Sequence, residues 1–202
     1  MSVLQSTDTD TLPKLMARNA RQWPTMPALR GKDRGIWRTT DWAEYQAQVR
    51  DFALGLMALG FKRGEKLTVV GDNRPRLYFA QIAAQALGGQ SVPLYQDSIA
   101  SELVYVLNHA EVSVVVAEDQ EQVDKILSLR EQLPKLRWVI YDDARGMTGY
   151  AKYEFIRSFA SVQEAGRAQG ASGAQAFEAE LKKGQADDLS MIAYTSGTTG
   201  NP

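Results

Sequence analysis

Hydrophobic positions along the chain follow two patterns in turn, and their alternation predicts strands and helices in succession. Short apolar runs without a polar face occur at Leu67–Gly71 and Val112–Ala117, and such runs are typical of strands buried on both sides. After the first run, apolar residues fill positions 77–87 with helical spacing. Further strands are predicted at 91–95 and 137–141, so strand and helix alternate through the first 141 residues.

Polar capping residues mark where three of the predicted helices begin. A short polar side chain can accept a hydrogen bond from the exposed N–H groups of a first helical turn, and a Glu or Gln three residues later completes a capping box. The first of these helices is predicted to end at Gly60, because glycine suits a helix C-terminus. The predicted caps are Asp41 with Glu44, Ser98, and Asp119 with Gln122.

The alternation of helices with doubly apolar strands predicts an α/β fold, with a mainly parallel sheet flanked by helices on both faces. We interpret residues 1–141 as the α/β core. Residues 142–189 contain scattered glycines and are expected to form loops and helices, including a helix over 174–183. Residues 190–202 are expected to form a buried strand followed by the start of a loop.

Composition excludes several classes of function. Lys and Arg total 23 against 24 Asp and Glu, for a net charge of -1, so no summed positive field favours nucleic acid. The sequence has no cysteine, which excludes disulfides and fits a reducing, cytoplasmic compartment. The polar start of the chain is unlike a secretory signal, and no apolar stretch approaches the ~18 residues of a spanning helix. Any membrane contact is therefore expected to be peripheral.

The segment YTSGTTGNP, at positions 194–202, carries the candidate chemistry. It sets four hydroxyl side chains and two glycines directly after an apolar run. Glycines let successive backbone N–H groups face one concavity, and hydroxyls can bind phosphate oxygens or Mg²⁺. The segment does not fit the Walker A pattern. On composition alone, both a phosphate-binding loop and an ordinary flexible loop are consistent with it.

The full string closely resembles the threonine-, serine- and glycine-rich ATP-binding motif of the adenylate-forming, or AMP-binding, family, which includes acyl-CoA synthetases, luciferases and amino-acid adenylation domains. WPTMPAL at 23–29, GDNRP at 71–75 and LGGQSVPLYQD at 87–97 are also similar to segments of these enzymes. Within the family, VPLY resembles the long-chain fatty acid–CoA ligase branch. Arg76-Leu77 departs from that branch, which usually has an acidic residue and tryptophan there.

The resemblance implies a part of the large N-terminal domain of an ATP-dependent acyl-CoA synthetase. Such an enzyme activates a fatty acid as an acyl-adenylate and transfers the acyl group to coenzyme A, so ATP, Mg²⁺, coenzyme A and the fatty acid are the implied ligands. By the same resemblance, Thr195 and Thr199 are the side chains placed to approach Mg²⁺, and no catalytic proton-transfer residue falls within the chain. The residues implied to hold the β- and γ-phosphates are Thr195, Ser196, Gly197, Thr198, Thr199 and Gly200.

Because the family's loop lysine, metal-binding glutamate and C-terminal domain would follow Pro202, the chain is expected to be inactive alone. Self-association through the predicted strand 190–195 is a further expectation, since an unpaired apolar strand can pair with another chain. Two alternatives stay open. One is an inactive nucleotide-binding or interaction module, and the other is a different acid-activating enzyme, luciferase-like or specific for aryl acids.

The remaining polar candidates favour structural roles. His109 is expected to end a helix, where it interacts favourably with the helix dipole. Arg74 is interpreted as bracing the turn after a strand, with contact to a ligand at that strand end as the alternative. Asp142 and Asp143 are adjacent, so they are expected to form a turn instead of a metal pair. Four tryptophans at apolar positions are expected to pack in the core or between layers: Trp23, Trp37, Trp42 and Trp138.

Overall fold

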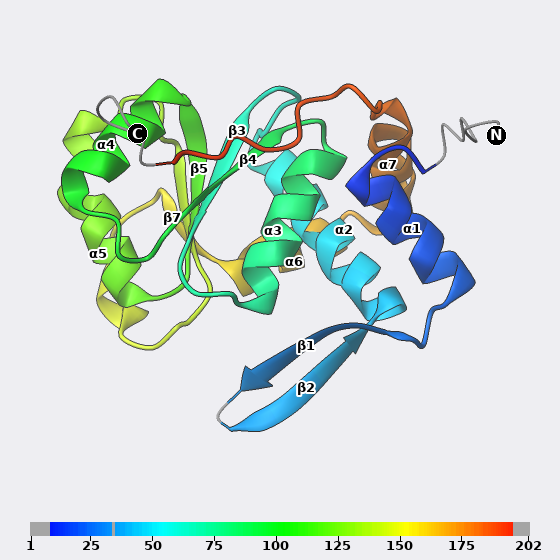
Figure 1. Ribbon diagram of the computed structural model, residues 1–202. Coiled ribbons are helices and arrows are strands. Elements are labelled where there is room, and N and C mark those ends of the chain that lie inside the picture. The colour runs from blue at the N-terminus through cyan, green and yellow to red at the C-terminus, as the bar shows by residue number, and fades with distance from the viewer. Residues whose placement is uncertain (1–8, 34, 196–202) are drawn as a thin grey trace.

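A five-stranded parallel sheet forms the centre of the structure, which is a computed structural model and describes residues 9–33 and 35–195. The strands follow the order β4-β3-β5-β6-β7, and helices cover both faces (Figure 1). The predicted α/β class is confirmed. The strands of the sheet are β3 (Lys66–Val70), β4 (Gln90–Leu94), β5 (Val112–Ala117), β6 (Trp138–Tyr141) and β7 (Ile156–Ser158), and a separate hairpin consists of β1 (Pro27–Asp33) and β2 (Ile36–Asp41).

The helices fall into two layers, one on each face of the sheet (Figure 1). One layer contains α1 (Leu12–Gln22), α2 (Trp42–Ala58), α3 (Pro75–Ala86), α6 (Phe159–Arg167) and α7 (Gly170–Lys183). The other contains α4 (Ala100–His109) and α5 (Gln120–Ser128), with short 3₁₀ turns at η1 (Arg130–Gln132) and η2 (Met147–Tyr150).

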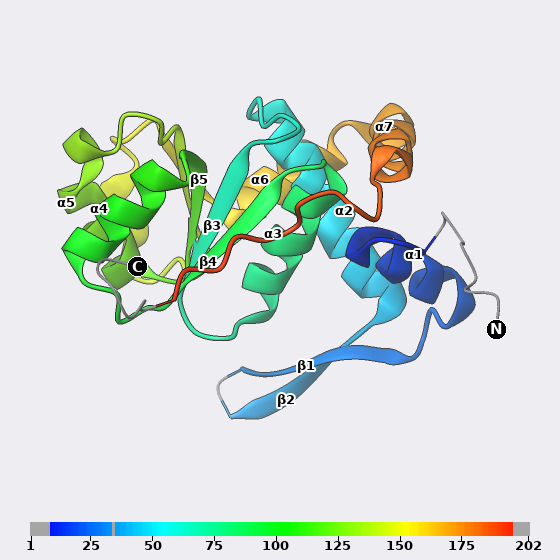
Figure 2. The ribbon, with the colours of Figure 1, turned by 45° about the horizontal axis from the view of Figure 1, so that its top comes forward.

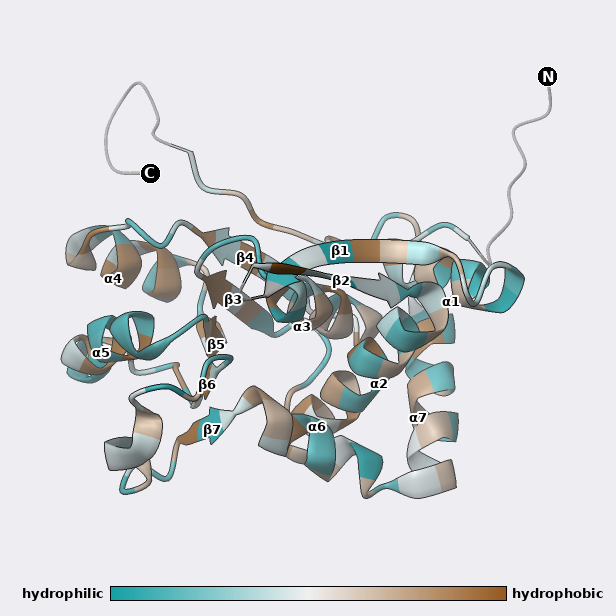
Figure 3. Ribbon diagram, turned by 90° about the horizontal axis from the view of Figure 1, so that it is seen from below, coloured by the Kyte–Doolittle hydropathy of each residue, from teal (hydrophilic) through white to brown (hydrophobic). Residues whose placement is uncertain are grey.

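Strand β5 shows why the sheet needs both layers. All six of its residues are buried. Val114 and Val116 belong to the core beneath α2, α3 and α6, whereas Val115 and Ala117 belong to the core beneath α4 and α5. Successive side chains of a strand point to opposite faces, so a strand with apolar residues on both faces requires cover on both. In Figure 3 strand β5 accordingly appears brown, between helices that mix brown and teal.

The order of the strands determines where their carboxyl ends meet. From β3 the chain passes through α3 to β4 on one side, then returns through α4 to β5 on the other side of β3. Right-handed crossovers in opposite directions place α3 and α4 on opposite faces, as observed. The direction of winding therefore reverses between β3 and β5. At such a switch point, open α/β sheets form a crevice beyond the carboxyl ends of the strands.

Helices α2 and α6 approach each other unusually closely, through two glycines. A Cβ atom added to Gly55 would lie 2.0 Å from the backbone oxygen of Val162, and one added to Gly166 would lie 1.9 Å from that of Asp51. Neither separation is tolerated by real atoms. The two helices thus pack backbone against backbone, and the fully buried rings of Phe52 and Phe159 stack with centroids 4.0 Å apart.

The hairpin β1–β2 projects from the helical layer and was not predicted from the sequence (Figure 2). Lys32 pairs with Trp37 across it, so these two side chains share a face. The opposite face meets the body, because a Cβ on Gly31 would lie 2.9 Å from Cγ of Pro75. Trp37 therefore points away from the protein and is 66% exposed. The prediction of a core position for this tryptophan is wrong.

Three other details differ from the predictions. Trp23 is 49% exposed, with the Arg18 guanidinium 5.8 Å from its ring centre, so its predicted core position is also wrong. The cap of α4 is Ile99 and not Ser98. The predicted cap residues Asp41 and Asp119 do accept hydrogen bonds from the first turns of α2 and α5. Strand β7 and helices α1 and α6 were not predicted as elements, and the helix predicted over 174–183 begins earlier, at Gly170.

The α2–α6 contact leads to a first prediction, on Gly166→Ala. Alanine is favoured over glycine within a helix by about 1 kcal/mol, but here its methyl group meets backbone. We expect the clash to dominate and the free energy of unfolding to fall by about 1–3 kcal/mol, measured by urea denaturation. Gly149→Ala is the control, because a Cβ there meets nothing within 4 Å. Equal stability of the two variants would contradict the close approach.

Candidate functional site

The predicted phosphate-binding loop begins where the described residues end. Thr195 is described and exposed. The other predicted loop residues lie outside the described residues: Ser196, Gly197, Thr198, Thr199 and Gly200. The segment 184–195, drawn orange to red in Figure 1, leads from the end of α7 past β4 to α4 and fixes where the loop starts. Its contacts therefore determine where the predicted loop begins.

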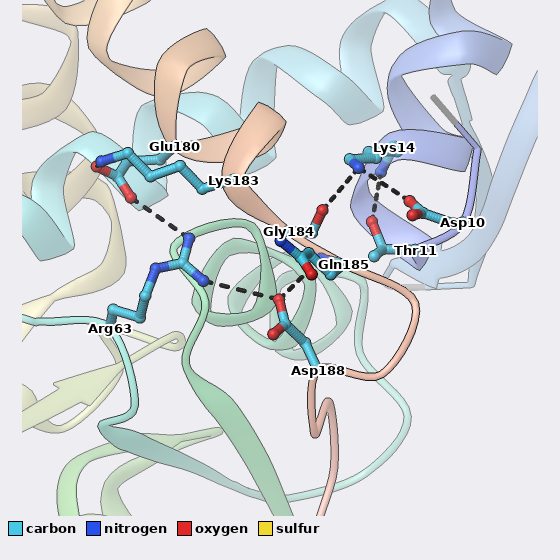
Figure 4. Close-up of polar contacts among 9 residues, drawn as sticks. All are labelled: Asp10, Thr11, Lys14, Arg63, Glu180, Lys183, Gly184, Gln185 and Asp188. Atoms are coloured by element: carbon cyan, nitrogen blue, oxygen red, sulfur yellow. Dashed lines mark hydrogen bonds and ion pairs between the residues drawn. The ribbon is translucent and has the colours of Figure 1, made fainter. Parts of the chain in front are cut away.

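The first part of this segment is held by charged side chains of α1 and of the loop before β3 (Figure 4). Lys14 Nζ donates to the Gly184 carbonyl oxygen at 2.7 Å and to Asp10 at 2.9 Å. Arg63 lies 3.6 Å from Glu180 and 3.7 Å from Asp188. Ion pairs of such exposure contribute little individually. Together they join the end of α7 to α1 and to the loop before β3.

The middle of the segment is held at one carbonyl group. The Ser190 oxygen accepts from the backbone N–H of Ser91 at 3.0 Å, from Gln85 Nε2 at 3.2 Å and from the Ser91 hydroxyl at 3.3 Å. Ile192 N–H then donates to the Ser91 oxygen at 2.9 Å. This is a single parallel bridge, between Ser91 and Met191.

The prediction of a buried strand at 190–195 is wrong, because the segment makes only this one bridge to β4. The backbone N–H of Gln90 points toward β3, since it donates to the backbone oxygen of Glu65. The backbone N–H and C=O groups of a strand alternate in direction, so those of residues 91 and 93 point away from β3, toward the outer edge of the sheet. The next N–H that could extend the ladder would belong to Pro93, which has none. The segment leaves the edge after one bridge, and Met191 is 43% exposed.

The end of the segment is held by aromatic residues of α4. Tyr194 Oη lies 2.6 Å from Nδ1 of His109. Tyr105, one turn earlier on the helix, stacks on the His109 ring at 5.5 Å and meets the Tyr194 ring edge-on at 6.5 Å. Burial raises the pKa of the Tyr194 phenol, so the hydroxyl keeps its proton at neutral pH. His109 is the last residue of α4, as predicted.

A separate polar cluster lies at the carboxyl ends of β3 and β5. Glu118 accepts from Arg74 Nε at 2.7 Å and from the backbone N–H of Asp72 at 2.6 Å. Arg74 thus braces the turn after β3, which agrees with the structural interpretation of this residue. A Cβ on Gly71 would lie 2.4 Å from Cβ of Glu118, so only glycine allows the two strand ends to approach this closely.

Arg76, the departure from the long-chain branch, has a clear structural role. It donates to Asp142 Oδ1 at 2.8 Å, and its guanidinium lies 5.3 Å from the ring centre of Phe159. Asp143 accepts from the backbone N–H of Arg145 at 2.9 Å, which supports the predicted turn. Burial raises the pKa of Asp142, and Arg76 opposes that shift.

A cavity of about 200 Å³ opens beside the segment, between the start of α1 and the end of α3. Gln85 and Ser190 contribute to its lining together with Leu181 and Leu189. Oε1 of Gln85 is buried and has no hydrogen-bond partner among the described residues.

Within residues 9–33 and 35–195, no group of three or more His, Cys, Asp or Glu side chains could hold a metal ion. Of the two predicted Mg²⁺ candidates, Thr195 is described and Thr199 is not. No helix in the described part of the chain is both long and apolar enough to cross a membrane.

Sequence reasoning missed the residues that hold the segment. Gln85 is a polar residue within an apolar helical run, which was a usable signal. Tyr105 has the helical spacing of one turn from His109, but nothing in the sequence connected either to Tyr194, 85 positions beyond His109.

Comparison with protein families gives one match that spans most of the chain. A family described as "AMP-binding enzyme" matches residues 16–202. Similar curated proteins include the long-chain-fatty-acid–CoA ligase heimdall of Drosophila melanogaster, 27% identical over the whole of this chain and 30% of its own length. The long-chain-fatty-acid–CoA ligase ACSBG1 of Rattus norvegicus is 27% identical over 90% of this chain and 24% of its own length. The chain thus spans 24–30% of these relatives.

Solved structures share the fold. Acetoacetyl-CoA synthetase from Streptomyces lividans superposes with a TM-score of 0.71 and 23% identity, covering 94% of this chain and 29% of that protein. The anthranilate CoA ligase AuaEII, solved with anthranoyl-AMP, has a TM-score of 0.71 and 18% identity, covering 94% of this chain and 33% of its own. At such identities the likeness is one of fold.

The Asp142 carboxyl leads to a second prediction. The folded state binds its proton more tightly than the unfolded state, so this group lowers stability as the pH rises from its ordinary value of 3.8 through the raised folded value. Asp142→Asn removes that charge and keeps an oxygen that accepts from Arg76. We expect the free energy of unfolding of the variant to rise relative to that of the unaltered protein across this pH window, and the difference to persist at pH 7.

Urea denaturation at a series of pH values measures the effect. Asp97→Asn is the control, because Asp97 is an exposed carboxylate in the loop after β4. A variant that loses stability relative to the unaltered protein as the pH rises would show that the ion pair with Arg76 outweighs burial.

Proposed function

Since this chain belongs to the AMP-binding enzyme family, we propose that the protein of which it forms a part is an ATP-dependent acyl-CoA synthetase. Its substrates are a long-chain fatty acid, ATP and coenzyme A. The observation that carries the proposal is the string YTSGTTGNP at 194–202, in a chain matched over nearly all its length by relatives named as long-chain-fatty-acid–CoA ligases. The same relatives favour the enzyme over an inactive binding module.

In the proposed reaction, a carboxylate oxygen attacks the α-phosphorus of ATP, the bond between the α- and β-phosphates breaks, and pyrophosphate leaves. The thiol of coenzyme A then attacks the acyl carbon, its proton is lost, and AMP departs. Residues 195–200 hold the β- and γ-phosphates and align the α-phosphorus. Alignment and charge stabilisation are the protein's main contributions to such a step.

Thr195 and Thr199 are the proposed hydroxyls near Mg²⁺, which neutralises phosphate charge when it is bound. The exposure of Thr195 at the end of the described segment suits a residue that meets a ligand from solution. The proposed location is the cytoplasm, with membrane contact limited to the periphery, on the basis of the cysteine-free composition.

The class of acid is tested by ATP–pyrophosphate exchange with the complete polypeptide. We expect palmitate to stimulate exchange more strongly than anthranilate. Stimulation by anthranilate alone would replace the long-chain proposal with the aryl-acid alternative. Absence of exchange with any carboxylic acid would favour the inactive binding module.

Substitutions in the loop give a third prediction. In the complete polypeptide, Gly197→Val and Gly200→Val should each lower adenylation more than Ser196→Ala. A valine side chain blocks backbone approach to phosphate or forbids a positive φ, whereas loss of one hydroxyl hydrogen bond costs only about 0.5–1.5 kcal/mol. Initial rates of ATP–pyrophosphate exchange measure the difference. Equal rates for all three variants would count against a phosphate-binding loop.

A further inference from the structure

We propose that His109 and Tyr105 are positioning residues for the phosphate-binding loop, which they hold by binding Tyr194 immediately before its first residue. The proposal rests on the proposed function for the role of the loop itself. Neither residue is a catalytic residue, because each acts on the loop through the Tyr194 side chain.

The contact consists of one hydrogen bond within an aromatic cluster. Nδ1 of His109 and Oη of Tyr194 are 2.6 Å apart, and their rings meet edge-on with centroids 5.8 Å apart. The Tyr105 ring stacks on the His109 ring, with centroids 5.5 Å apart and an angle of 15° between the ring planes. The imidazole is thus held between a hydrogen bond and a ring face, which restricts its rotation.

This contact replaces support that a β-ladder would otherwise give. Pro93 supplies no N–H to the outer edge of β4, so regular pairing ends after the bridge at Met191. Beyond Ile192, Tyr194 is the residue whose side chain returns the segment to the protein. Ile192 also packs on the core beneath α4, so the two residues fasten successive points of the same short stretch.

The contact lies one residue from the loop. Adjacent Cα atoms are about 3.8 Å apart, so the position of Tyr194 sets the position of Thr195 closely. Displacement of a reacting group by about 1 Å can lower a rate about 100-fold. The start of a loop that aligns ATP therefore needs a firm attachment, and α4 provides it.

The direction of this hydrogen bond follows the imidazole tautomer. With the ring proton on Nε2, Nδ1 accepts from the Tyr194 hydroxyl, whereas with the proton on Nδ1 the imidazole donates to the phenol oxygen. Nitrogen-15 NMR of the histidine, which is the only one in the chain, reports the tautomer directly. Tyr194→Phe should shift the Nδ1 resonance while leaving the ring stack with Tyr105 in place.

The central experiment compares His109→Leu, His109→Asn and Tyr194→Phe in the complete polypeptide, without ATP. We expect backbone hydrogen exchange over 191–195 to rise about 2- to 10-fold in His109→Leu and Tyr194→Phe, the range for one hydrogen bond. His109→Asn should restore most of the protection, because its side-chain amide can replace Nδ1 as either acceptor or donor. The double variant His109→Leu/Tyr194→Phe should be no worse than either single change.

Asn108→Ala is the matched control, because Asn108 precedes His109 on α4 but donates to the Gln132 oxygen at 2.9 Å, away from the segment. It should leave exchange over 191–195 unchanged. If His109→Leu and Tyr194→Phe also leave it unchanged, the proposal is overturned, whatever the enzyme's activity.

The KM for ATP and kcat of the same variants separate this proposal from the proposed function. If the loop aligns ATP, His109→Leu should raise the KM for ATP by a factor similar to the rise in hydrogen exchange, with no change in melting temperature. Faster exchange together with an unchanged KM and kcat would overturn the positioning role of His109 and Tyr105, whereas the role of the loop in ATP binding is overturned by equal rates for the Gly197→Val, Gly200→Val and Ser196→Ala variants.

Discussion

The sheet is kept from water on both faces, and this constraint organises everything else in the structure. A parallel strand such as β5 has no polar face, so helices must lie against each side of it. The need for two layers forces the chain to cross the sheet in both directions from β3. That reversal brings the ends of β3 and β5 together and leaves β4 at the edge, where the segment from α7 passes.

Sequence patterns predicted the elements that obey this constraint. The runs that became β3 and β5 carry apolar residues on both faces because both faces are buried, and this makes them recognisable in the sequence. The hairpin β1–β2 has no such pattern in its sequence, since one of its faces is open to solvent and the apolar Trp37 lies on that face. Strand β7 has three residues, too few for a period of two to stand out.

The candidate site was predicted unevenly, for a similar reason. The loop motif is local, so a short string was enough to indicate phosphate chemistry. The bracing role of Arg74 was also local, as part of a turn. Its partner Glu118 lies 44 positions away, and Gln85 lies 105 positions from Ser190. Contacts across such separations depend on how layers pack, which no pattern within one segment specifies.

Pro93 has a consequence beyond the path of one segment. A strand at the edge of a sheet normally offers a row of unpaired donors and acceptors to any extended chain it meets, and proteins that expose such a row tend to aggregate. On the outer side of β4, one donor is occupied by Ser190 and the next is missing. The proline therefore leaves the border of the sheet at β4 with fewer free donors even where the segment from α7 does not lie against it.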